Sequence, residues 1–137
     1  MKDFRYSSSP FDCLVYNGKI LLGIECKMLS ERKNGEKPKS FPFDRVTDTQ
    51  REGLLDIDRF ESAKGLILVN FRWFSGKGKC YVLPISEFIY LEHALSEGEL
   101  KNKYRNTKSI PLEYFEKCTL ELHRYKRGWD LRPLLLE

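Results

Sequence analysis

The sequence has no apolar run that approaches the ~20 residues a helix needs to cross a membrane. Its first residues include the charged Lys2, Asp3 and Arg5 and lead into a run of serines, so they lack the apolar core of a secretory signal peptide. Both absences argue against an integral membrane protein or a secreted one. We therefore expect a cytoplasmic protein with no membrane partner.

Histidine and cysteine are scarce, and their spacing does not match the common zinc motifs. Neither His93 nor His123 stands at zinc-finger spacing from a cysteine pair, and no two of the four cysteines form a C-x-x-C pair. Cys13, Cys26 and Cys80 sit in apolar, strand-like segments, and we expect them to be small buried side chains in a reducing cytosol. A zinc site is therefore not expected.

The composition that remains is suited to one soluble globular domain. With 137 residues, 41% hydrophobic and 32% charged, the chain can bury one core and is too short for two domains. We expect a single domain over 1–137, with its core at about 11–95 and a basic tail at 96–137. The net charge of +4 is gathered in three basic stretches, 27–51, 101–108 and 123–129. Together they favour a surface that binds a polyanion over three merely solvated loops.

Local patterns predict an α/β fold with a mixed β-sheet flanked by helices. We expect a hairpin of 11–16 and 19–27 around Asn17-Gly18, a polar loop at 31–39, and strands at 65–73 and 80–83. Thr47-Asp48-Thr49-Gln50 has the form of a capping box, so a helix should begin near Thr47 and end before Gly65. A second helix is expected at 86–95, capped by Ser86, and a short third helix after Pro111.

The predicted hairpin places charged side chains on one face of its two strands. With a two-residue turn at 17–18, Asp12 stands opposite Gly23 and is a diagonal neighbour of Glu25, ~7–8 Å away. Lys27 follows on the same face, whereas the other face is apolar and should belong to the core. Two carboxylates beside a lysine can hold Mg²⁺, which polarises a phosphate oxygen and activates water. The alternative is a surface hairpin whose charges only aid solubility.

Gln50 is a polar residue on the apolar face of its helix. It lies between Val46 and Leu54 at helical spacing and should point toward the sheet. One interpretation is that it is only the last member of the capping box, and the other is that it reaches the acidic site. Both hold together if the helix starts beside that site.

Several short stretches, taken in order along the chain, resemble one nuclease family. Asp12 followed by Glu25-Cys26-Lys27 is similar to the D…(D/E)xK core of the PD-(D/E)XK nucleases. Ser40-Phe41-Pro42-Phe43 and the later Thr49-Gln50 resemble the "SFPL…HQ" stretch of the RecU-type Holliday-junction resolvases. Lys108-Ser109-Ile110 and then Trp129-Asp130-Leu131 resemble the "KSI…DY" ending of that family. The resemblance covers nearly the whole chain, from about Ser9 onward.

The resemblance implies a restriction-endonuclease-like fold and a homodimer that nicks opposing strands of four-way DNA junctions with Mg²⁺ or Mn²⁺. It implies Asp12 and Glu25 as metal ligands, with the main-chain carbonyl of Cys26 as a third. It also implies Lys27 as the motif lysine and Gln50 as a residue that faces the site. The loop of residues 32–39 would be the counterpart of the stalk that enters the junction centre in family members.

The resemblance and the basic stretches together predict the DNA contacts. The residues expected to bind DNA are lysines and arginines of two polar segments: Arg32, Lys33, Lys37, Lys39, Lys101, Lys103 and Arg105. The chain departs from the family at its N-terminus, where Asp3 is the sole acid before Asp12 although family members bring another acidic residue to the site.

Two other functions fit the same residues. One is a non-catalytic DNA-binding or recombination-accessory dimer that keeps the fold, and the other is an endonuclease that acts on flaps or duplex sites. The absent N-terminal acid favours the first of these, whereas the acids and the lysine together favour an enzyme. For a dimer, the expected apolar surface is aromatic: Phe71, Trp73, Phe74, Tyr114 and Phe115.

Overall fold

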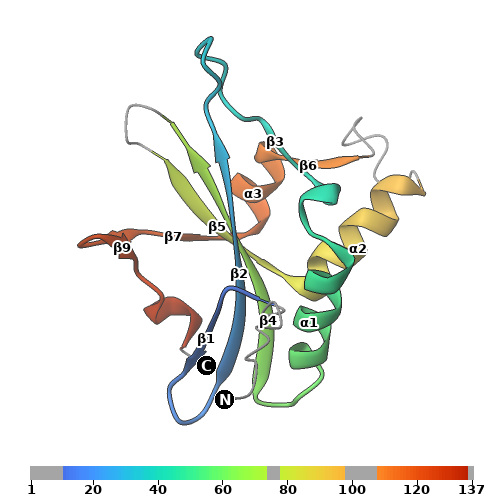
Figure 1. The fold of residues 1–137 in the computed structure, drawn as a ribbon, viewed down its shortest axis with the longest axis vertical. Helices are drawn as coiled ribbons and strands as arrows, with labels where there is room; N and C mark the ends of the chain where they lie inside the picture. The colour runs from blue at the N-terminus through green and yellow to red at the C-terminus, as the bar shows by residue number, and fades with distance from the viewer. Residues whose placement is uncertain (1–10, 74–77, 98–107, 136–137) are drawn as a thin grey trace, which may run out of the picture.

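A mixed sheet of five strands forms the centre of the protein (Figure 1). The computed structural model describes residues 11–73, 78–97 and 108–135. The strands are β1 (Cys13–Tyr16), β2 (Leu21–Ser30), β4 (Ala63–Arg72), β5 (Lys79–Pro84) and β7 (Leu120–Leu122), in the spatial order β1-β2-β4-β5-β7. Only β2 and β4 run parallel, and the connection between them contains α1 (Asp48–Asp58). The predicted α/β fold with a mixed sheet is thus confirmed.

Three helices cover one face of the sheet. Besides α1 these are α2 (Ile85–Ser96) and α3 (Leu112–Cys118), and their apolar side chains share one buried cluster with alternate residues of β4 and β5. Glycine permits the closest approach of α1, because a Cβ on Gly65 would lie 2.3 Å from the main-chain oxygen of Leu54. At Gly23 a Cβ would lie 2.7 Å from Ile57 Cδ1. The Ile57 side chain of α1 therefore fills the space beside Gly23.

The other face of the sheet is covered by the C-terminal part of the chain. Ile24, Leu68 and their neighbours on this face pack against residues of the segment 129–135. That segment contains β9 (Gly128–Trp129), which pairs with β8 (Arg124–Tyr125), and the short 3-10 helix Arg132–Leu134. Both faces of the sheet are thus buried, although only one of them is covered by the three helices.

Residues after Ser96 are integral to the fold. Ile110, Phe115 and Leu122 are fully buried, and β7 pairs with β5 in the central sheet. In addition, β3 (Ser40–Pro42) pairs antiparallel with β6 (Ser109–Pro111), so two stretches quoted for the family resemblance lie side by side. The basic tail expected at 96–137 therefore wraps around the core over the part of it that the structure describes.

The helix starts were predicted correctly for α1 and incorrectly for α2. In α1, the Thr47 hydroxyl accepts from the main-chain N–H of Gln50, and the Gln50 side chain accepts from the N–H of Thr47, which completes the capping box. In α2, Pro84 is the N-cap and no side chain caps the helix, so the expected Ser86 cap is wrong. The fixed φ of proline is compatible with this position. The short helix predicted after Pro111 is present as α3.

The first hairpin turns one residue later than predicted. Its turn residues are Gly18 and Lys19, because Asn17 pairs with Ile20 through an N–H to carbonyl bond of 3.4 Å. Gly18 has a φ of +92°, which suits the first central position of a type II′ turn. The Asn17 side chain accepts from the N–H groups of both Lys19 and Ile20. The later turn shifts the register of the two strands by two residues.

The aromatic residues expected to form a dimer surface belong largely to the core. Phe71 and Phe115 are fully buried and contact each other edge to face, with ring centroids 5.4 Å apart. Tyr114 is partly buried against the same cluster, and Trp73 is half-buried. Phe74 lies outside the described residues. Within the described parts of the chain, no helix is long and apolar enough to cross a membrane.

Candidate metal-dependent active site

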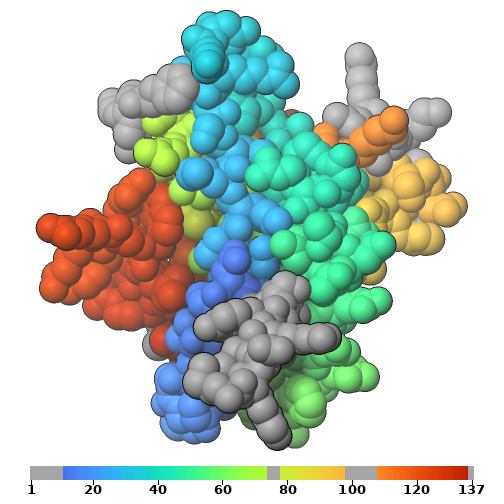
Figure 2. All heavy atoms as spheres, in the orientation of Figure 1, coloured from blue at the N-terminus to red at the C-terminus, as the bar shows by residue number. Residues whose placement is uncertain are grey.

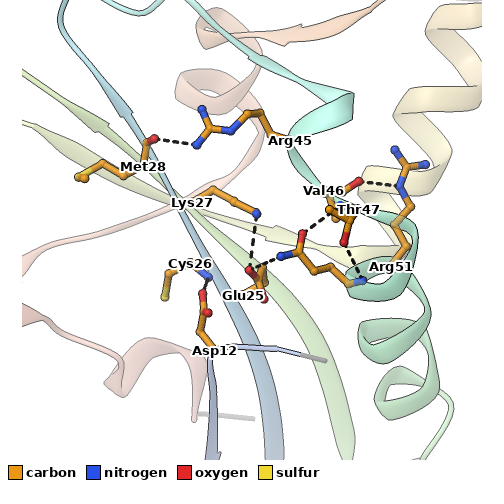
Figure 3. Close-up of polar contacts among 10 residues, drawn as sticks. Asp12, Glu25, Cys26, Lys27, Met28, Arg45, Val46, Thr47 and Arg51 are labelled. Carbon is orange, nitrogen blue, oxygen red and sulfur yellow. Dashed lines mark hydrogen bonds and ion pairs between the residues drawn. The ribbon is translucent and has the colours of Figure 1, made fainter. Parts of the chain in front are cut away.

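Glu25 is a buried acid in the middle of β2, on the sheet face that the helices cover. It is only 4% exposed, and its neighbour on β4 in the parallel register is Ile67, a fully buried core residue. Its Oε1 accepts a hydrogen bond of 2.9 Å from Gln50 Nε2, and Lys27 Nζ lies 3.6 Å from the same oxygen (Figure 3). A carboxylate in such a place needs partners, because burying an unpaired charge is costly.

Gln50 serves the helix cap and the site at the same time. Its Oε1 accepts the Thr47 N–H at 2.9 Å, while its Nε2 donates to Glu25. The start of α1 is held in turn by Arg51, which donates to the carbonyl oxygens of Val46 and Phe43 and forms an ion pair with Glu92 of α2. Both interpretations of Gln50 from the sequence therefore hold together, because the capped end of α1 lies beside the acid.

Asp12 lies at the open end of the β1–β2 hairpin, where the strand pairing stops. Its N–H donates to the Ile24 carbonyl at 2.8 Å, and its Oδ2 accepts the Cys26 N–H at 2.7 Å. The paired register ends with Cys13 opposite Ile24, which is shifted by two residues from the register that the sequence predicted. Asp12 therefore lies beside the Ile24–Cys26 segment and not opposite Gly23, as the sequence predicted, and its carboxylate is close enough for its charge to raise the pKa of Glu25.

Cys26 contributes its main chain to this site and directs its side chain elsewhere. In a strand, the N–H and C=O of one residue point to the same side, so the Cys26 carbonyl faces the edge where Asp12 binds its N–H. Successive side chains alternate across the sheet, so the Cys26 thiol lies on the face opposite Glu25. The oxygen donors gathered here are therefore two carboxylates and one carbonyl.

The pKa of Glu25 is raised above the ordinary value for glutamate. Burial is the largest cause, the negative charge of Asp12 is the second, and the positive charge of Lys27 opposes them without cancelling them. The site therefore carries more negative charge than its own residues neutralise. A hard divalent cation would neutralise this excess negative charge. Mg²⁺ suits the site, because it prefers carboxylate and carbonyl oxygens and keeps several water ligands.

The donor set fits Mg²⁺ or Mn²⁺ with few protein ligands. Within the ranges that the structure describes, no group of three or more His, Cys, Asp or Glu side chains is placed to hold a metal. Asp12, Glu25 and the Cys26 carbonyl would hold the ion, with water completing its shell. Lys27, whose side chain is 14% exposed, stands next to this position and can place its charge on a phosphate that approaches it.

Basic side chains extend from this site into the loop of residues 31–39. The loop projects beyond the end of β2 at the top of Figure 1, and Arg32, Lys33, Lys37 and Lys39 are all exposed there. Three of these four line a surface cavity of about 430 Å³ together with Arg45. Lys37 also lies over the Trp73 ring, with 5.4 Å from Nζ to the ring centroid.

Arg45 joins the acidic site to the basic loop, and the sequence reasoning missed it. Its Nη2 donates to the Met28 carbonyl at 3.1 Å, so it lies next to Lys27 and forms part of the cavity wall (Figure 3). The available signal was a basic residue two positions before the capping box, which is weak by itself. Arg45 therefore extends the candidate site toward the loop.

Other predicted site residues are placed differently or are not described. Cys13 and Cys26 are exposed and only Cys80 is buried, so the expectation that all three are buried is wrong for two of them. Cys13 lies on β1, which is a short edge strand, and Cys26 lies on β2 beyond the last residue that pairs with β1. Lys101, Lys103 and Arg105 lie outside the described residues.

Comparisons of the chain with protein-family models and with curated proteins find no match. The geometry of the site therefore carries the functional argument.

Proposed function

We propose that this protein is a metal-dependent, structure-specific DNA endonuclease, similar to the RecU-type Holliday-junction resolvases, that nicks opposing strands of a four-way junction. The observation that carries the proposal is Glu25, a buried acid beside a second acid, with Gln50 and Lys27 both directed at the same carboxylate oxygen. A residue placed only for solubility would not be buried with two dedicated partners. The mixed sheet with α1 between its parallel strands is compatible with a restriction-endonuclease-like fold.

Each residue of the site has a defined part in phosphodiester hydrolysis. When bound, Mg²⁺ or Mn²⁺ would polarise a phosphate oxygen and supply an activated water nucleophile. Asp12 and Glu25 supply the negative charge that retains the ion, and the Cys26 N–H orients Asp12. Gln50 fixes the orientation of Glu25, and Lys27 stabilises the negative charge that develops on the phosphoryl group. Arg45 and the loop cations bind flanking phosphates.

Branched DNA is the proposed substrate, and a homodimer is the proposed assembly. A junction needs two cuts on opposing strands, and two active sites related by a two-fold axis meet this need. The basic loop of residues 31–39, which projects from the site, is the part proposed to reach the junction centre. Static light scattering with and without a four-way junction tests the assembly, and a monomer at micromolar concentration in both conditions contradicts it.

A second candidate is a non-catalytic DNA-binding dimer with the same fold. One observation favours it: among the described residues, no third acidic, histidine or cysteine side chain joins Asp12 and Glu25. A site with two carboxylates binds a divalent ion more weakly than a site with three. In this alternative, the acids remain from an enzyme ancestor and the basic loop carries the function.

The deciding experiment compares DNA substrates and metals. End-labelled four-way junction, flap, duplex and single-stranded DNA are incubated with the protein in Mg²⁺, in Mn²⁺ or in EDTA. Symmetric nicks on the junction, dependent on either metal, are the expected result. Cleavage confined to flaps or duplex would support the nuclease assignment and would overturn the four-way junction as its substrate. Junction binding without any cutting in either metal overturns the nuclease and supports the second candidate.

A further inference from the structure

A small basic hairpin lies away from the candidate active site. It consists of β8 and β9 and occupies the left side of Figures 1 and 2, whereas α1 lies on the right. Trp129 at its base packs against the apolar cluster on the sheet face opposite Glu25. The hairpin and the active site therefore present different surfaces of one rigid sheet.

The aromatic rings of the hairpin are covered by cations. The Arg124 guanidinium lies 4.7 Å from the centroid of the Trp129 ring. Lys126 and Arg132 lie 5.4 Å and 5.1 Å from the centroid of the Tyr125 ring. These contacts compete with the stacking of a nucleic-acid base on the same rings. They restrict the orientations of the cations, so that charged groups are held in place before a ligand arrives.

The basic residues in and beside the hairpin differ in their partners. Arg132 forms a two-pronged pair with Asp130, and His123 lies 3.8 Å from Glu121. Arg124, Lys126 and Arg127 form no ion pair with any described residue, and all three are exposed. Three uncompensated charges thus lie within four consecutive residues of one turn.

Lys126 has a backbone conformation that does not favour lysine. Its φ is +55°, and it is the only described non-glycine residue with a positive φ. Glycine or asparagine adopts this conformation at lower cost. A strained residue at an exposed tip points to a functional requirement for its side chain, which here is a charge.

We propose that the β8–β9 hairpin is a second DNA-binding surface, which contacts the phosphates of a duplex arm away from the cleavage site through Arg124, Lys126 and Arg127. Exposed cations on a two-stranded ribbon, of which Arg124 and Lys126 are held over aromatic rings, suit the regular charges of a duplex backbone. The covered rings argue against a single strand, whose bases need free aromatic faces. The proposal rests on the proposed function for the identity of its ligand.

The test measures how salt affects duplex binding. Fluorescence anisotropy of a labelled 30-base-pair duplex is recorded in EDTA at several salt concentrations, for the parent and for Arg124→Gln with Arg127→Gln. Each lost phosphate contact lowers the slope of log K against log salt by about 0.9, so the pair should lower it by about 1.8. The control is Arg59→Gln with Lys117→Gln, which removes the same charge from the C-cap of α1 and from α3 and should leave the slope near that of the parent.

Lys126→Gly separates a binding effect from a folding effect. It removes one charge and also relieves the positive φ, so the melting temperature should stay level or rise while the slope falls by about 0.9. A lower melting temperature with an unchanged slope would mean that Lys126 has a structural role, and this would overturn the proposal.

The remaining outcomes distinguish this surface from the active site. If the hairpin double variant and the control double variant lower the slope equally, the proposal of a second DNA-binding surface is overturned. Metal-dependent cleavage by the parent would still support the nuclease. If the parent does not bind DNA at all, both proposals fail. Anionic phosphatidylglycerol vesicles and duplex RNA serve as further probes. A loss that is confined to vesicles or to RNA also overturns the assignment to DNA.

Discussion

Charge is used in opposite ways at the Glu25 site and on the β8–β9 hairpin. Glu25 is a single buried charge with two side-chain partners and an acid beside it. The hairpin carries three exposed charges with no ion-pair partner among the described residues. A buried charge acts through short, oriented contacts, whereas exposed charges act through a field that salt screens. A single substitution at Glu25 should therefore abolish most of the cleavage activity. On the hairpin, each charge that is removed should lower the affinity for DNA by a similar amount.

Glu25→Gln should give the largest effect of any single substitution. The amide keeps the size of the side chain and can still accept from Gln50, but it removes the charge that retains the metal. Cleavage of a four-way junction should fall by about a hundredfold or more, because several kcal/mol of metal-derived stabilisation is lost. Junction binding in EDTA should persist or tighten slightly.

Lys27→Ala is the matched variant for Glu25→Gln. It should also reduce cleavage, but Mn²⁺ affinity measured by calorimetry should remain close to that of the parent, because the lysine is not a ligand. Parent-like cleavage by Glu25→Gln would place the metal elsewhere and remove the basis of the nuclease assignment.

Gln50→Glu should give the next largest effect, and it tests whether Gln50 acts through Glu25. Glutamate keeps the capping-box acceptor for Thr47 but replaces the N–H that reaches Glu25 with a negative charge. The pKa of Glu25 should rise further, so the acidic limb of the pH–rate profile should move to higher pH.

Thr47→Ala is the control for the helix cap alone. It should lower the free energy of unfolding by about 1 kcal/mol and leave the pH–rate profile in place. A profile that shifts equally in both variants would assign Gln50 to the helix cap only.

Neutralising the basic loop should give a smaller, graded effect on binding. Arg32→Gln, Lys37→Gln and Lys39→Gln together should weaken binding of a four-way junction more than binding of a duplex, if the loop enters the junction centre. The control triple is Arg59→Gln, Lys64→Gln and Lys117→Gln. Competition assays at two salt concentrations provide the comparison. Equal losses of affinity for the junction and for the duplex would mean that the loop contributes only general electrostatic attraction.

The smallest expected effect is a pH dependence of stability from Glu25 in the metal-free protein. Its pKa is raised on folding, so between the usual glutamate pKa and the folded value the folded state binds more protons than the unfolded state. Stability from this group is present below that interval and is lost as the pH rises through it. Urea unfolding in EDTA should show this loss for the parent and not for Glu25→Gln. A matching slope in the variant would contradict the assignment.

Metal should reverse that loss. At a concentration of Mn²⁺ about 100 times its Kd, the parent should gain about 2.7 kcal/mol of stability, and Glu25→Gln should gain little.

The sequence predicted features that depend on local chemistry better than features that depend on packing. The capping box located the start of α1, because its hydrogen bonds involve residues three apart. The alternation of the hairpin placed Glu25 and Lys27 on one face correctly, since the two-residue register shift preserves parity.

The errors arose where distant segments decide the outcome. Asn17-Gly18 indicated a turn one residue early, and the actual turn depends on Asn17 binding two later N–H groups and on burial of Ile20. The burial of Phe115 and Leu122 depends on the pairing of β5 with β7. The segment around β7 is polar and basic, and no local pattern in it predicts this pairing.

The position of β7 has a consequence for synthesis of the chain. The residues of the acidic site leave the ribosome early, but the edge of β5 stays open until β7 has been made. At translation rates of about 5–20 residues per second, the interval between Pro84 and Leu120 lasts roughly 2–7 s. During that time an apolar strand edge is free to pair with a neighbouring nascent chain. Slowed translation between these positions should therefore increase aggregation on polysomes, without any change in the finished protein.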